Sequence, residues 1–183
     1  MFFPIYSAGD YMDSSCHHPR NPACPDPLQK PAGYGKIEPE QNIRGESSML
    51  KDIADKYYFS QNYNCAETII HAANEYYNLG LHQRDMVMLS GYGAGMQTAS
   101  TCGALLSTIS VLALKYVETR AHESKDLQPV TFLLTKKFKE AFSSTLCKDI
   151  KPQSFRKEIR CQNTVHKACD ILEEVLAEYQ PKE

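Results

Sequence analysis

The chain has 183 residues and a mass of 20.7 kDa, the size of one ordinary domain with room for an appendage. Its net charge of −2 and pI of about 6.3 argue against a nucleic-acid-binding face and against binding to anionic membranes. No run reaches the ~18 apolar residues of a membrane helix. The start, MFFPIYSAGD, lacks the basic and apolar regions of a secretory signal, so we expect a cytoplasmic protein.

The chain contains seven cysteines, an odd and fairly high number. Hydrophobic residues make up 42% of the sequence, so a core can form without disulfide crosslinks. Thiols in such a chain indicate metal binding, redox chemistry or simple burial.

The first 45 residues differ in composition from the rest. They hold seven of the ten prolines and show no hydrophobic periodicity. Because proline removes a backbone donor and favours extended geometry in its predecessor, we predict an irregular arm over residues 1–45. We predict one helical, cysteine-containing domain over the remaining residues, 46–183.

Three helices are predicted in the first half of this domain. The first covers residues 48–59. The second begins after Asn64, which forms a capping box with Glu67, and it ends at Gly80. This placement makes Cys65 the first helical residue. A short helix follows at 84–89, directly before a glycine-rich loop.

Three more helices are predicted in the second half. A helix over 103–119, capped by Ser100 or Thr101, is apolar nearly all round, which is typical of the buried centre of a bundle. The next carries Pro129 in its first turn and ends near Cys147. The last covers 163–179 with a regular apolar stripe. The sequence therefore predicts an all-α fold, a compact bundle of five to six helices with an irregular proline-rich N-terminal arm.

Cys65 and Cys102 are the strongest candidates for chemistry. Each lies at a predicted helix N-terminus, where the helix dipole and free amides favour a thiolate. Cys102 also follows the run Gly91-Tyr92-Gly93-Ala94-Gly95, whose amides could stabilise a thiolate, a cluster sulfide or an anion. The alternatives are a small buried hydrophobe at Cys65 and a tight turn before Cys102. No strand precedes GYGAGM and no Lys-Ser/Thr follows it, so a nucleotide loop is rejected.

The other cysteines carry weaker signals. Cys147 and Cys161 bracket a short polar segment that contains Pro152, at a spacing too long for a CxxC knuckle. Cys169 lies on the apolar stripe of the last helix and is predicted to be in the core. The arm contains two cysteines and a histidine pair: Cys16, Cys24, His17 and His18. For these residues an unstructured segment is favoured over a zinc site.

The segment from about Ile53 to Leu176 resembles the C_GCAxxG_C_C family of redox-active proteins. The resemblance is carried by YNCAETII, the glycine loop, TCGALLSTISVLALKY, Cys147 and the stretch from Cys161 to ILEE. It implies that the family's cysteines are Cys65, Cys102, Cys147 and Cys161. One position departs from the pattern, because Ser107 stands where the family has its second glycine.

A related helical module occurs in split-Soret cytochromes, where the resemblance implies an iron–sulfur cluster held by cysteines. The haem part of those proteins has no counterpart here. The leading hypothesis is therefore that residues 46–183 form a redox domain with an iron–sulfur cluster on these four cysteines, used for electron transfer or redox sensing. Gly93, Gly95 and Gly103 would contribute close backbone contacts to the cofactor.

Two alternatives stay open. One is a metal-free thiol–disulfide redox protein, with Cys102 as the favoured nucleophile because the helix dipole should lower its pKa, and Cys65 as its partner. The other is a zinc-stabilised, non-catalytic interaction module. We expect an unidentified redox partner protein, no nucleic acid and no membrane. The sequence leaves the oligomeric state open, a homodimer included.

Overall fold

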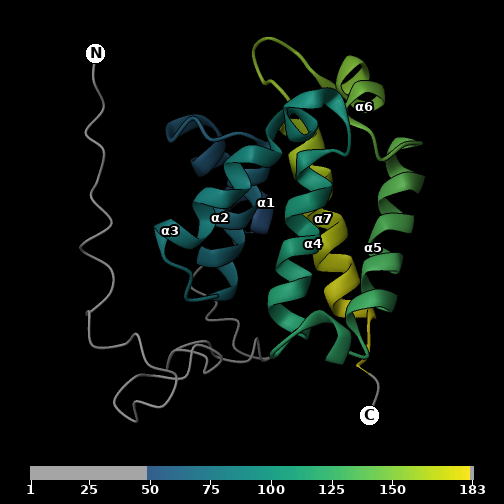
Figure 1. Ribbon diagram of the computed structural model, residues 1–183. Coiled ribbons are helices and arrows are strands. Elements are labelled where there is room, and N and C mark those ends of the chain that lie inside the picture. Colours follow the sequence, from purple (N-terminus) through teal and green to yellow (C-terminus); the bar gives the residue numbers. More distant parts are fainter. Residues whose placement is uncertain (1–48, 182–183) are drawn as a thin grey trace. The chain divides into compact units, whose positions relative to one another are not determined.

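The helices enclose one hydrophobic core in the computed structural model, which describes residues 49–181 (Figure 1). The predicted arm, with its two cysteines and two histidines, lies outside the described residues. In the described part there are helices and no strands, apart from isolated bridges between single residue pairs. The predicted all-α fold is confirmed.

The first two helices form as the sequence indicates. Helix α1 covers Leu50–Asp55 and continues as a π-helical turn, η1, over Lys56–Ser60. Helix α2 covers Cys65–Tyr77. Its cap is the predicted one, because the Asn64 side chain accepts hydrogen bonds from two backbone amides of the first turn and the Glu67 carboxylate accepts one from the Asn64 amide. It ends with Asn78 in the left-handed conformation, two residues before the predicted Gly80.

Helix α4, Gly103–Tyr116, lies at the centre of the bundle, as its all-round apolar sequence predicts. It packs against α2, against α5 (Leu127–Phe142) and against α7 (Gln162–Glu178). Figure 1 shows α4 between α2 and α5. The prediction that Ser100 or Thr101 caps this helix is wrong, because the N-cap residue is Cys102 itself.

Two short helices complete the architecture. Helix α3, Gln83–Met86, leads into a 3₁₀ turn, η2, over Val87–Tyr92, close to the predicted helix at 84–89. Helix α6, Cys147–Ser154, lies in the short polar segment between Cys147 and Cys161, where no helix was predicted. The sequence did not predict this helix because it contains Pro152 near its C-terminal end, and proline is unfavourable in a helix interior. Residues 49–181 therefore contain seven α-helices, one more than the upper end of the predicted five to six.

The core draws on most of these helices. Its largest fully buried side chains lie on α1, α2, α4, α5 and α7 and are Phe138, Leu50, Ile69, Ile70, Leu105, Leu112, Leu134, Ile171, Leu172, Val111, Val130 and Val165. Cys169 is also fully buried among them, as predicted. Across residues 49–181, no helix is both long enough and apolar enough to cross a membrane.

Ser107, at the position of the family's second glycine, lies on the face of α4 that meets α2. It is fully buried, and its hydroxyl donates a 2.8 Å hydrogen bond to the backbone carbonyl of Ala66. A serine is therefore accommodated between the two helices because its polar atom has a partner there.

Candidate four-cysteine site

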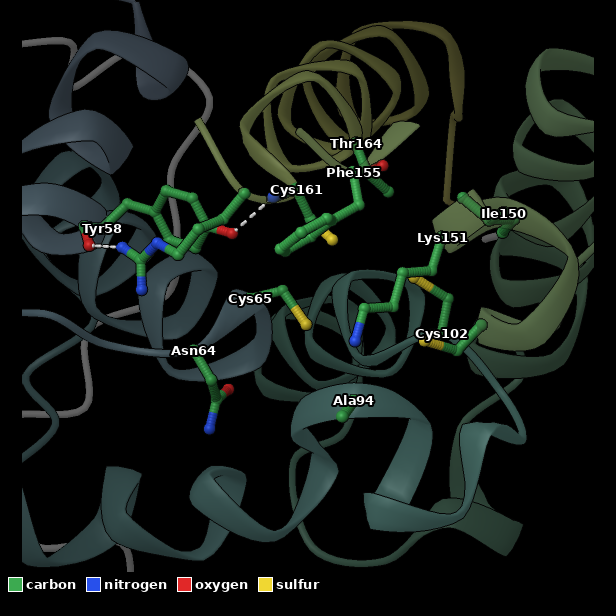
Figure 2. A pocket seen from close by; sticks show the side chains of 12 residues that line it. Tyr58, Asn64, Cys65, Ala94, Cys102, Ile150, Lys151, Phe155, Cys161 and Thr164 are labelled. Carbon is green, nitrogen blue, oxygen red and sulfur yellow. Dashed lines mark hydrogen bonds between the residues drawn. The ribbon is translucent and has the colours of Figure 1, made fainter. Parts of the chain in front are cut away.

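Four helices begin around one cavity, and each has a cysteine as its first residue or its N-cap residue. Cys65 and Cys147 are the first residues of α2 and α6, and Cys102 and Cys161 are the N-cap residues of α4 and α7. All four line a cavity of about 170 Å³, shown in Figure 2, together with Tyr58, Asn64, Ala94, Ile150, Lys151, Phe155, Arg160 and Thr164. The structure thus brings together the four cysteines that the resemblance groups. Their thiols are free.

A pair of backbone hydrogen bonds positions Cys102 beside Cys147. The Cys102 amide donates to the carbonyl of Thr145 at 2.8 Å, and the Cys147 amide donates to the carbonyl of Ser100 at 2.6 Å. The residues between them, Thr101 and Leu146, form an isolated antiparallel bridge. The start of α4 is therefore fixed to the start of α6 by the backbone alone.

Glycines allow the chain segments around the cavity to approach closely. A Cβ atom at Gly103 would lie 2.5 Å from the carbonyl oxygen of Tyr92 and 2.9 Å from the sulfur of Cys65. A Cβ atom at Gly95 would lie 2.6 Å from the Cβ of Cys147, and Gly95 has a φ of +65°. At Gly93 the obstacle would be the Asn64 side chain at 2.7 Å.

These contacts give the predicted cofactor-binding glycines an observed role. Gly93, Gly95 and Gly103 make room for Asn64, Cys147 and Cys65, and the loop residue that lines the cavity is Ala94. The loop is also strained, because four of its non-glycine residues have φ between +51° and +59°: Ala94, Met96, Gln97 and Ala99. Such strain in an ordered loop clusters at functional sites.

Cys161 is held by Tyr58, which lies in η1 at the end of α1. The Cys161 amide donates a 2.8 Å hydrogen bond to the Tyr58 hydroxyl. The Arg160 guanidinium lies 4.0 Å from the centre of the Tyr58 ring and donates to the Tyr58 carbonyl and to the Asn62 side chain. The start of α7 is thereby tied to the first helix of the domain.

Burial raises the pKa of all four thiols. The pKa of Cys65 rises to about 11 and that of Cys102 to about 12, chiefly through loss of solvent and then through the neighbouring thiols. Amides of the first turn of α4 counteract this at Cys102, as its position predicts, but they are outweighed. The prediction that the helix dipole leaves Cys102 with a lowered pKa is therefore wrong.

Two cations offset part of this effect. Lys151 lowers the pKa of Cys147 and of Cys161, and Arg160 lowers that of Cys161, although burial still raises both overall. Figure 2 shows the Lys151 side chain extending from α6 across the cavity. The site is thus a cluster of thiols with two positive groups among its lining residues.

Thr164 is the one buried polar side chain of the lining whose hydroxyl lacks a partner. Thr164 is 2% exposed, and its Oγ1 atom makes no hydrogen bond. Buried hydroxyls are nearly always satisfied, so an unpaired one in a residue that lines the cavity is unusual.

Sequence reasoning missed four of these residues. Lys151 lies four residues after Cys147 on α6, and Thr164 lies three residues after Cys161 on α7, so helical spacing would have found them once both helix starts were known. Arg160 directly precedes Cys161. Tyr58 carries no local signal, since it reaches Cys161 across 103 residues of sequence.

In the described part of the chain, no group of three or more His, Cys, Asp or Glu side chains has the geometry of a preformed metal site. The four cysteines line one cavity without forming such a group. Their chemistry nevertheless fits such a centre, because four thiolates are the usual ligand set for iron–sulfur clusters and for structural zinc.

The sequence profile of the family described as "Putative redox-active protein (C_GCAxxG_C_C)" matches residues 63–175, more than half of the chain. The matched stretch contains Cys65, Cys102, Cys147 and Cys161. No curated protein and no solved structure matches the chain.

We predict that Gly103→Ala destabilises the protein by about 1–3 kcal/mol, because the added methyl group meets the Tyr92 carbonyl and the Cys65 sulfur. Gly91→Ala is the matched control, since a Cβ atom at Gly91 has no neighbour within 4 Å. Urea unfolding measures both variants. Equal free energies of unfolding for the two variants would show that the close approach of Gly103 to Tyr92 and Cys65 is not needed.

We also predict that Cys65 in the metal-free protein reacts slowly with iodoacetamide at pH 8. The thiolate is the reactive form, and a pKa of about 11 leaves little of it at that pH. The rate should rise as the pH approaches 11, whereas in urea-unfolded protein it should rise near pH 9. Mass mapping of the labelled peptide gives both profiles, and coincident profiles would contradict the predicted shift.

Proposed function

The chain belongs to the C_GCAxxG_C_C family of redox-active proteins, and on this premise we propose that its four cysteines hold an iron–sulfur cluster for electron transfer or redox sensing. The observation that carries the proposal is the convergence of Cys65, Cys102, Cys147 and Cys161 on one cavity. A bound cluster would supply one-electron chemistry, which cysteine thiols by themselves do not.

The backbone supports thiolates at two of these positions. Amides of Ala94 and Ala66 lower the pKa of Cys65, and those of Ala104 and Leu105 lower the pKa of Cys102. Such N–H donors stabilise a ligating sulfur and raise the reduction potential of a cluster. In the proposed site they would hold the sulfurs in their anionic form.

Charge balance also favours a cationic centre. Cys102 and Cys147 are buried and Cys65 and Cys161 are half-buried, and neighbouring thiols raise the pKa values of Cys65, Cys102 and Cys161 further. Four thiolates in one cavity repel one another, and Lys151 and Arg160 supply only two compensating charges. Metal cations would supply the remainder and convert this repulsion into attraction.

The thiol–disulfide alternative is weaker on the same grounds. A nucleophilic cysteine needs a thiolate near neutral pH, and burial raises the pKa values of both candidates, Cys102 and Cys65, instead. The zinc alternative shares the ligand set with the cluster, so the metal content of the protein separates the two.

The test is to purify the full chain without oxygen and to measure iron, acid-labile sulfide and zinc per chain, together with the visible spectrum. We expect iron and sulfide in equal amounts and a brown protein. The Cys147→Ala variant should lose most of the iron and sulfide. The Cys169→Ala variant should keep them, because Cys169 is buried in the core and does not line the cavity.

Two results would contradict the proposal. Zinc without sulfide would favour the structural metal site. A metal-free protein that loses two free thiols on mild oxidation would favour disulfide chemistry.

We predict a role for Thr164 in setting the potential of this centre. A hydroxyl that donates to a ligating sulfur stabilises the reduced state, so Thr164→Val should lower the reduction potential by roughly 60 mV, the equivalent of a bond worth ~1.4 kcal/mol. In metal-free protein the same change should leave the free energy of unfolding unchanged or higher, because it removes an unpaired buried hydroxyl.

The matched control is Thr68→Val. Thr68 is also buried with an unpaired hydroxyl, but it does not line the cavity. Redox titration of the two variants should show a shift for Thr164→Val alone. Equal potentials would show that the Thr164 hydroxyl does not bond to the centre.

A further inference from the structure

The segment that closes one side of the cysteine cavity is basic. Between Cys147 and Cys161, helix α6 and the turn after it carry two acidic residues, Asp149 and Glu158, and five basic ones: Lys148, Lys151, Arg156, Lys157 and Arg160. The whole chain, in contrast, has a net charge of −2. Positive charge is therefore concentrated on this one stretch.

These basic groups have no acidic partners. Ion pairs hold other lysines of the bundle, such as Lys51 with Asp170 and Lys56 with Glu75. Over residues 49–181, none of the ion pairs involves a basic residue of the α6 segment: they join other parts of the bundle. Arg160 is held by Tyr58 and Asn62, but Lys148, Arg156 and Lys157 are exposed, so their charges are available to a second molecule.

A groove on this segment adjoins the cysteine cavity. Lys148, Lys151, Pro152 and Phe155 line it, and it encloses about 360 Å³. Lys151 and Phe155 also line the cavity, so the two spaces share a wall. Phe155 is 39% exposed, and the Lys151 amine lies 5.3 Å from the centre of its ring.

An exposed aromatic ring with unpaired cations around it has the composition of a transient protein interface. Aromatic residues supply contact area at the centre of such interfaces, and rim charges steer the partner and speed association. Because the groove shares its wall with the cavity, a partner bound there would lie directly beside the cysteines. Electron transfer requires that proximity.

We propose that this groove, which we call the α6 groove, docks the acidic surface of an electron-transfer protein. The proposal rests on the proposed redox function of the cysteines. It assigns Lys148 and Lys157 to steering, and Phe155 to the centre of the contact. Weak, salt-sensitive complexes of small buried area are usual for electron-transfer partners.

The test is a binding titration of the full, anaerobically purified chain with a flavodoxin, a small acidic electron carrier, at low and high salt. We expect saturable binding at 20 mM salt that weakens at least tenfold at 300 mM. Lys148→Glu and Lys157→Glu should each weaken it about tenfold. The matched control is Lys125→Glu, which makes the same change at an exposed lysine beyond the C-terminal end of α4, far from its Cys102 end.

Three outcomes would overturn the proposal. They are no saturable binding to the flavodoxin at low salt, a loss of affinity with Lys125→Glu as large as that with Lys148→Glu and Lys157→Glu, or binding to phosphatidylserine vesicles without binding to the flavodoxin. The iron and sulfide content of the same samples reports on the cluster separately. A protein that contains the cluster but fails to bind flavodoxin contradicts only the α6 groove, and one that binds without a cluster contradicts only the proposed function.

Discussion

Four helices can begin around one cavity only if the segments that start them approach without side chains between them. Gly103 provides this contact between the start of α4 and the sulfur of Cys65, and Gly95 provides it beside Cys147. The paired hydrogen bonds between Ser100–Cys102 and Thr145–Cys147 then lock α4 to α6. The rest of the site follows from these backbone contacts, since each helix carries its cysteine at or next to its N-cap.

The same arrangement sets the electrostatics of the site. Backbone amides lower the pKa values of Cys65 and Cys102, but burial outweighs them, and burial is the largest cause of the raised pKa at all four cysteines. These shifts disfavour thiolates as long as no cation is bound beside them. Its cations, Lys151 and Arg160, lie in the lining, and the α6 segment extends the positive charge to the surface.

Much of the fold could be predicted from local sequence. The Asn64–Glu67 cap, the apolar helix α4 and the stripe of the last helix are short-range patterns, and the structure confirms each. Helix α6 was missed because Pro152 interrupts its pattern. The grouping of the four cysteines came from the resemblance. Tyr58 and Thr164 could not be predicted, because the first depends on a contact across 103 residues and the second on a missing partner.

The most direct test of the central claim is a crystal structure of the anaerobically purified protein with anomalous data collected at the iron edge. We expect iron within bonding distance of the sulfurs of Cys65, Cys102, Cys147 and Cys161. Iron bound elsewhere, or four free sulfurs around an iron-free cavity in protein that contains stoichiometric iron, would contradict it.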